Sequence, residues 1–209
     1  MAAALAHGTP DVDALSAART ALLRARRLVD EHGMQELSAR IGFSDVVLTA
    51  LEGDPVSALG QAHERLDDWR AFGRGNRLIL ALVATARIAL LADRPRDARR
   101  LVGEAMRLIA ECAWPGPLRG AAEVLAQVSA ATDPEAAATL LGAADARPPT
   151  HRWRMFTDLT ATRAMLEDAL GQERFTARQA EGAQLNLDDV AALAGRVLTA
   201  DLDAPLKPG

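Results

Sequence analysis

The sequence predicts an all-α protein, on the evidence of its composition, its turn residues and an internal repeat. Of its 209 residues, 49% are hydrophobic and 25% are charged, as in ordinary globular proteins. Ala makes up roughly a fifth of the chain, whereas aromatic residues make up only 3% and Tyr is absent. Ala favours helices, and β-branched and aromatic residues favour strands. This composition excludes an all-β fold and disfavours an α/β sheet.

An internal repeat supports the same fold class. At intervals of about forty residues, an apolar helical stretch ends in a short turn with Asp and Pro, and a small residue follows one turn later. The recurring small residues are Ala58, Ala98 and Ala137, which would let the two helices of a hairpin approach closely.

The turns between these helices contain capping residues. In Asp54-Pro55 and Asp133-Pro134, the Asp side chain can accept hydrogen bonds from the new helix, and Pro suits its first position. In Asp93-Arg94-Pro95 the cap is offset by one residue. Hydrophobic spacing between such breaks predicts ten helices, over residues 12–31, 35–51, 55–72, 76–92, 95–112, 117–131, 134–146, 152–170, 173–182 and 187–199.

Short turns make consecutive helices antiparallel, and one hairpin alone cannot bury both of its faces. The sequence therefore predicts antiparallel helix hairpins stacked as a right-handed α-solenoid. The arrangement would be of the tetratricopeptide type, with a repeat longer than the usual length of about 34 residues. We expect repeats over 1–147, a C-terminal helical cap of the same solenoid over 148–200, and a flexible tail over 201–209.

Charge and cysteine content exclude several classes of function. The chain has 24 basic and 28 acidic residues, a net charge of −4, whereas nucleic-acid-binding domains are usually basic. Cys112 is the only cysteine, which rules out an internal disulfide and favours a cytoplasmic setting; we expect it to be a buried, inert thiol. The most apolar stretch, 78–92, contains Arg87 and is too short to span a membrane.

No pattern of catalytic or cofactor-binding residues emerges. The four histidines are scattered and do not pair at helical spacing. The Gly-rich turn at 72–76 lacks the Lys and the length of a phosphate-binding loop. The sequence therefore predicts no enzyme activity, no cofactor and no metal.

Tryptophan beside arginine is typical of interface anchors, so we expect an interaction surface at two places. One is Arg152-Trp153-Arg154, which follows a break in the repeat, and the other is Trp69-Arg70 at the end of a helix. Packing in the core or at a hairpin corner is the alternative for the tryptophans, Trp114 included.

Clusters of arginine admit two interpretations. A solvated face with local ion pairs is the default, and Arg100–Glu104 and Arg107–Glu111 have the spacing for such pairs. A docking surface for an acidic partner is the alternative. The clusters are Arg24, Arg26 and Arg27 in one helix and Arg94, Arg96, Arg99, Arg100 and Arg107 in another.

Three segments near the C-terminus share a recognisable pattern. They are Leu-Leu-Gly-Ala-Ala-Asp at 140–145, a Leu-Gly-x-x-x-Phe segment at 170–175, and Ala-Glu-Gly-Ala-Gln-Leu-Asn-Leu-Asp-Asp-Val from 180. Together they resemble the end of the tetratricopeptide-like region, or MalT-like repeats, of large bacterial ATPase regulators of the LuxR and AfsR types. The likeness runs from 140 to 194, and the earlier repeats match only in style.

The residues of this pattern have structural roles. We expect Asn186 to cap the last helix in a capping-box arrangement with Asp189, and Phe175 to anchor the shorter helix before it. Gly171 and Gly182 are expected to terminate helices.

The resemblance implies a non-enzymatic protein-interaction and signal-sensing module of a bacterial transcriptional regulator. Such a module would respond to a small molecule or a partner protein and restrain or couple to an ATPase domain absent from this chain. The chain would then be a fragment, or a member without a DNA reader, and would contact neither nucleic acid nor membrane. A small-molecule-binding protein is the alternative, with Trp69, Arg152 and Trp153 lining a pocket between repeats; an all-α enzyme is the least favoured.

Overall fold

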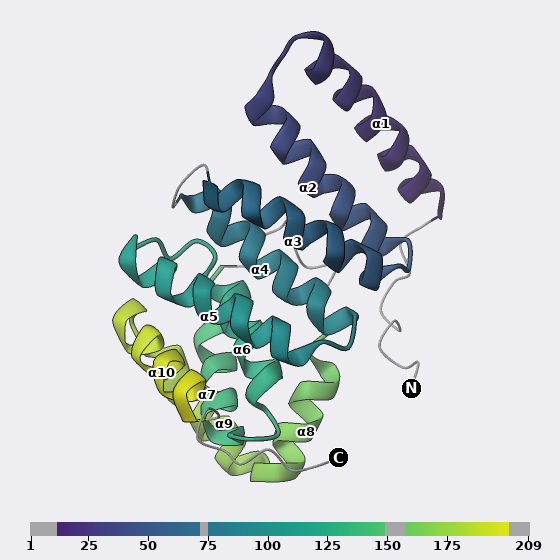
Figure 1. Ribbon diagram of the computed structural model, residues 1–209. Helices are drawn as coiled ribbons and strands as arrows, with labels where there is room; N and C mark the ends of the chain where they lie inside the picture. Colours follow the sequence, from purple (N-terminus) through teal and green to yellow (C-terminus); the bar gives the residue numbers. More distant parts are fainter. Residues whose placement is uncertain (1–11, 72–74, 149–157, 201–209) are drawn as a thin grey trace, which may run out of the picture.

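The computed structural model describes residues 12–71, 75–148 and 158–200, and these parts are helical, with no strand among them (Figure 1). The predicted all-α class is confirmed for these parts. The helices are α1 (Val12–Glu31), α2 (Gln35–Leu51), α3 (Pro55–Ala71), α4 (Asn76–Leu91), α5 (Pro95–Glu111), α6 (Leu118–Ser129), α7 (Pro134–Asp145), α8 (Thr160–Leu170), α9 (Gln172–Ala183) and α10 (Leu187–Ala200).

The predicted helix ends agree with the structure to within two residues, except at the start of α8. That helix was predicted from residue 152, but it begins at Thr160 and its first intrahelical bond runs from Arg163 N to Leu159 O. Asp158 Oδ1 accepts the amide hydrogen of Thr160, a local bond that competes with helical geometry before that point. Residues 149–157 lie outside the described parts.

Two of the three predicted Asp caps are confirmed. Asp54 Oδ1 accepts from Ser57 N at 2.9 Å, and Asp133 Oδ1 accepts from Ala136 N at 3.0 Å. Asp93 makes no such bond, because it lies one residue further from the helix and adopts a positive φ of 56°. A single Asp-Pro step therefore starts both α3 and α7 in the same way.

A capping box starts the last helix, as predicted. Asn186 Oδ1 accepts from Asp189 N at 3.0 Å, and Asp189 Oδ2 accepts from Asn186 N at 3.3 Å. Gly171, at φ 75°, ends α8 as expected. The expectation for Gly182 is wrong, because this glycine lies inside α9, where it is buried against α7.

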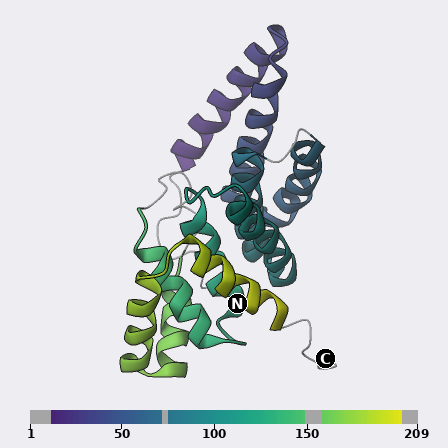
Figure 2. The same cartoon turned by 90° about the vertical axis from the view of Figure 1, so that its left-hand side faces the viewer.

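The hairpins α2–α3, α4–α5 and α6–α7 pack in succession, with α4 in contact with both α2 and α6 (Figures 1 and 2). The alanines of the repeat, Ala58, Ala98 and Ala137, are fully buried at 0% exposure, so the expected close approach of the helices is confirmed. Most of α4 is buried, because it lies between two hairpins.

The C-terminal helices do not simply extend this stack. The α8–α9 pair packs against α7, whereas α10 returns to α5 and also touches α6 and α7. Arg99 Nη2 donates to the carbonyl of Val197, and Leu198 lies over Gly103. The segment predicted as a cap therefore covers the end and one side of the stack.

Candidate interaction surfaces

The structure separates the residues that the sequence singled out for interaction. Trp69 is only 9% exposed and belongs to the hydrophobic core, so it is not a surface anchor. Arg152, Trp153 and Arg154 lie outside the described residues. Within the described parts, Trp69 and Arg70 therefore form no exposed Trp–Arg surface, and a pocket lined by Trp69, Arg152 and Trp153 remains a prediction.

Arg70 links two hairpins. Its guanidinium donates to both carboxylate oxygens of Glu104 on α5, with Nε–Oε1 at 3.1 Å and Nη2–Oε2 at 2.6 Å, and also to Asp67 at 2.9 Å. The hydrogen bond to Glu104 is the main reason that the pKa of Arg70 is raised above its ordinary value. The local pair predicted between Arg100 and Glu104 does not form; Arg100 lies 3.9 Å from Asp97 instead.

Two other expectations for this region have different outcomes. Arg107 pairs with Glu111, as predicted. Cys112 was expected to be buried, but it is exposed, because it caps the C-terminal end of α5 where the chain turns outward. Trp114 is half-buried, packs against the core and covers Gly116, which is a hairpin-corner role.

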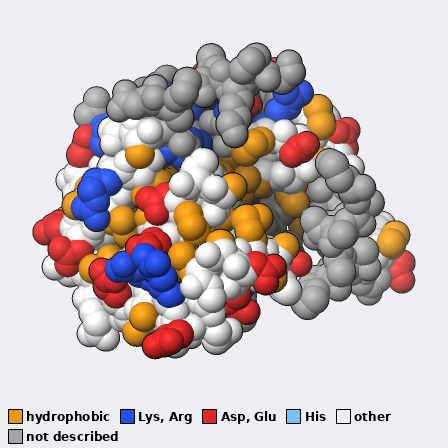
Figure 3. All heavy atoms as spheres, turned by 90° about the horizontal axis from the view of Figure 1, so that it is seen from below, with side chains coloured by type: hydrophobic (Ala, Val, Ile, Leu, Met, Phe, Trp, Pro, Cys, Tyr) orange, Lys and Arg blue, Asp and Glu red, His pale blue; other side chains and the backbone are white. Residues whose placement is uncertain are grey.

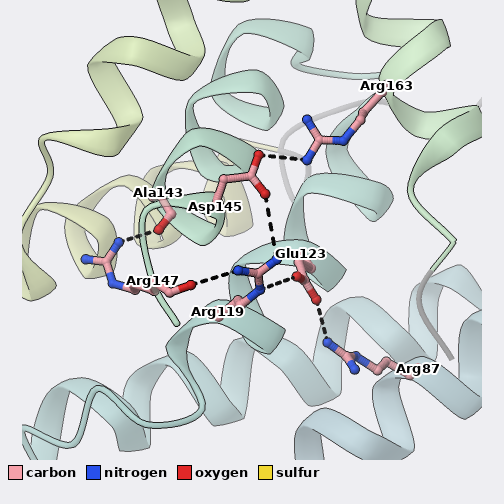
Figure 4. A network of polar contacts seen from close by, with 7 residues as sticks. All are labelled: Arg87, Arg119, Glu123, Ala143, Asp145, Arg147 and Arg163. Carbon is pink, nitrogen blue, oxygen red and sulfur yellow. Dashed lines mark hydrogen bonds and ion pairs between the residues drawn. The ribbon is translucent and has the colours of Figure 1, made fainter. Parts of the chain in front are cut away.

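A buried ion pair joins α4 to α6 (Figure 4). Arg87 Nη2 donates to Glu123 Oε2 at 2.6 Å, and the side chains are 4% and 8% exposed. Burial lowers the pKa of Arg87 from its ordinary value, and the charge of Glu123 opposes that effect. Arg87 lies inside the apolar stretch 78–92, and no acidic residue lies one helical turn away from it. This arrangement indicates an acidic partner on another helix, which the sequence analysis did not predict.

The pair continues outward through Arg119 of α6. Its Nε donates to the second oxygen of Glu123 at 2.9 Å, and its Nη1 donates to the carbonyl of Arg147 at 2.7 Å. Asp145, at the end of α7, lies 3.8 Å from Arg119 and accepts from Arg163 of α8 at 2.7 Å. Figure 4 shows these side chains as one connected network that branches at Arg119.

This network ties together helices that are distant in the sequence. Its cross-hairpin bonds span 36 residues for Arg87–Glu123 and 38 for Arg147–Leu185, and Arg70–Glu104 spans 34. These separations are close to the length of one repeat. Each of these bonds therefore joins one hairpin to the next. The carboxylates of the network, Glu123 and Asp145, are paired with arginines.

Helix α1 has a different environment, because one side of it is uncovered. Of its twenty residues only Val29 is buried, and its main contacts are with α2. Five of the seven exposed large hydrophobic side chains of the described parts lie in or between these two helices: Val12, Leu23, Leu28, Met34 and Leu37. Arg24, Arg27, Leu28 and Glu31 line an open hollow of about 410 Å³ on α1.

Hydrophobic side chains also gather on the face seen from below in Figure 3. Charged side chains border that area. The α1–α2 hairpin stands out because it carries large hydrophobic side chains that are each more than a third exposed. Within those residues the α1–α2 hairpin is the candidate interaction surface.

Other kinds of site find no support in the described parts of the chain. No cluster of three His, Cys, Asp or Glu side chains that could hold a metal ion occurs in residues 12–71, 75–148 and 158–200. In the same residues no helix combines the length and the hydrophobicity that crossing a bilayer requires.

Comparisons with known proteins identify no relative of this chain. No protein-family model, no curated protein and no solved structure matches this chain.

Proposed function

We propose that this chain is a non-enzymatic protein-interaction and signal-sensing module, the tetratricopeptide-like part of a bacterial transcriptional regulator of the LuxR or AfsR type. It would bind and restrain, or couple to, an ATPase domain outside this chain. The observation that carries the proposal is the α1–α2 hairpin, where large hydrophobic side chains and arginines stay exposed beside a well-buried stack. Exposed apolar side chains grouped in this way are a common mark of protein-binding surfaces.

Two of the three glycines in the resembling segments give the proposal further support. Gly142 belongs to the first segment and Gly182 to the third, and they lie at one crossing of α7 and α9. A side chain at either position would meet the backbone of the other helix, which gives a physical reason for both glycines in the pattern. A stack of hairpins with exposed surface suits the binding of another protein domain.

The test uses an ATPase domain of a LuxR- or AfsR-type regulator encoded in the same genome. The purified chain is added to it, complex formation is followed by light scattering, and ATP hydrolysis is measured. We expect a complex and a several-fold change in the rate of hydrolysis. No complex and an unchanged rate at saturating concentration of the chain would overturn the proposal.

A further inference from the structure

The arginines of α1 fall into two groups. Arg19 and Arg26 face α2: Arg19 pairs with Asp45 and Glu52, with its Nε 3.1 Å from Glu52 Oε1, and Arg26 lies 3.8 Å from Asp45. Arg24 and Arg27 are exposed and form no hydrogen bond or ion pair with any described residue. Within the described residues, therefore, only the arginines on the α2-facing side of α1 have acidic partners.

Two exposed leucines border the second side of α1. Leu23 is 54% exposed and Leu28 49% exposed, and helical spacing places Arg24 and Arg27 between them on the side away from Val29. The open hollow at Arg24, Arg27, Leu28 and Glu31 lies on this side. We call these five residues, Leu23, Arg24, Arg27, Leu28 and Glu31, the outer face of α1.

We propose that the outer face of α1 binds an acidic amphipathic helix of a partner protein; this inference rests on the proposed function and names the chemistry of the partner. Helix α2 shows what such a partner needs. It holds the inner side of α1 with two acidic residues seven apart, Asp45 and Glu52, and with apolar side chains between them. That spacing matches Arg19 and Arg26, which are also seven apart, whereas Arg24 and Arg27 are three apart. An amphipathic helix with two acidic residues three apart would therefore pair with Arg24 and Arg27 and cover Leu23 and Leu28.

The charges of the chain favour a protein partner over a membrane or a nucleic acid. Asp30 and Glu31 lie in the same turns as Arg27 and Leu28, and the whole chain has a net charge of −4. An anionic bilayer or a phosphate backbone would meet these carboxylates over a wide area. A single helix can place its carboxylates at the two arginines and avoid Glu31.

The experiment uses the full chain and a labelled, side-chain-bridged helical peptide of roughly 20 residues. The peptide carries two Glu three residues apart beside a Leu stripe, and binding is followed by fluorescence anisotropy. We expect the double variant Arg24→Glu/Arg27→Glu to weaken binding by about tenfold or more, and a peptide with Lys in place of Glu to bind that variant instead. Leu28→Ser should also weaken binding of the acidic peptide.

The matched control is Arg96→Glu/Arg196→Glu, which reverses two exposed arginines that make no described pair on α5 and α10. It should leave binding unchanged. Equal effects of the two double variants, or equal binding of a scrambled peptide, would overturn the inference. So would a dimer of the chain, or sedimentation with phosphatidylserine vesicles, that depends on Arg24 and Arg27, since the occupant would then be a second copy or a membrane.

The two proposals can fail separately. If the ATPase domain responds to the chain and Arg24→Glu/Arg27→Glu does not alter that response, the function stands and the outer face of α1 is not the docking site. If neither ATPase binding nor peptide binding occurs, both proposals fail.

Discussion

Gly142 of α7 and Gly182 of α9 lie at one helix crossing, and each stands where the main chain of the other helix passes. A β-carbon on Gly142 would overlap the carbonyl of Gln179, and one on Gly182 would overlap the carbonyl of Thr139. Thr139 precedes Gly142 by three residues and Gln179 precedes Gly182 by three, so the relationship is reciprocal. The two backbones approach this closely only because both residues lack a side chain.

Alanine at either glycine should therefore push α7 and α9 apart. We expect Gly142→Ala and Gly182→Ala each to lower the free energy of unfolding by about 2–3 kcal/mol, measured by urea unfolding followed by circular dichroism. Gly195→Ala is the control, because a β-carbon there meets nothing within 4 Å. It should stabilise α10 by about 0.5–1 kcal/mol, and a loss at Gly195 as large as at the crossing would contradict this explanation.

The buried pair of Arg87 and Glu123 leads to a second prediction. Glu123→Gln leaves the Arg87 charge buried without its counter-ion and should destabilise the protein by about 3 kcal/mol in thermal or urea unfolding. Adding Arg87→Met should recover most of that loss, because the remaining Gln can still accept from Arg119. Glu111→Gln breaks an exposed pair and should change stability by less than about 0.5 kcal/mol. If the double variant is no more stable than Glu123→Gln, buried charge is not the cause.

The bond between Arg70 and Glu104 should depend on the shape of the guanidinium. Arg70→Lys keeps the charge but cannot donate to both oxygens of Glu104 from a planar fork. We expect it to cost about 1 kcal/mol of unfolding free energy, close to the cost of Glu104→Gln. Asp67→Asn, which alters only the exposed partner of Arg70, should cost much less. Full stability of Arg70→Lys would show that charge alone holds the hairpins together here.

The capping residues offer a fourth comparison within one chain. Asp54→Ala and Asp133→Ala each remove a bond to an otherwise unpaired amide and should each destabilise by about 1 kcal/mol. Asp93→Asn is the control, because Asp93 makes no cap bond and Asn tolerates its positive φ. Chemical unfolding of the three variants measures the difference. An equal cost at Asp93 would argue against the capping explanation.

Cys112 provides a chemical test of the end of α5. Since the thiol is exposed, it should react with Ellman's reagent in the native protein to a stoichiometry of about one, without denaturant. Cys112→Ser should abolish the reaction and leave the unfolding midpoint nearly unchanged. Reaction only after unfolding would mean that the thiol is covered, as the sequence alone suggested.

Local chemistry explains what was predictable. Helix ends are set by bonds within a few residues, so Asp54, Asp133 and the Asn186–Asp189 box could be identified from their spacing alone. The buried alanines were predictable for a similar reason, since they recur at one position of each repeat. The start of α8 was missed where a local side-chain bond, from Thr160 N to Asp158, competes with the helix.

Which side chains pair with each other could be decided only from the tertiary structure. Glu104 had Arg100 four residues away, yet it bonds Arg70, because α3 and α5 both pack against α4 and this brings the guanidinium to both of its oxygens. Trp69, an expected anchor, is held in the core by the same packing.

By itself, the sequence determined the helical class, the helix bounds except the start of α8, and the caps at Asp54, Asp133 and Asn186, because these depend on propensity and on hydrogen bonds between near neighbours. Only the tertiary structure decided which glycines meet, where α10 lies, which carboxylate neutralises Arg87, and which arginines of α1 stay without an acid. Those relationships join residues one repeat or more apart, and they depend on how the hairpins pack, which hydrophobic spacing within a single helix does not specify.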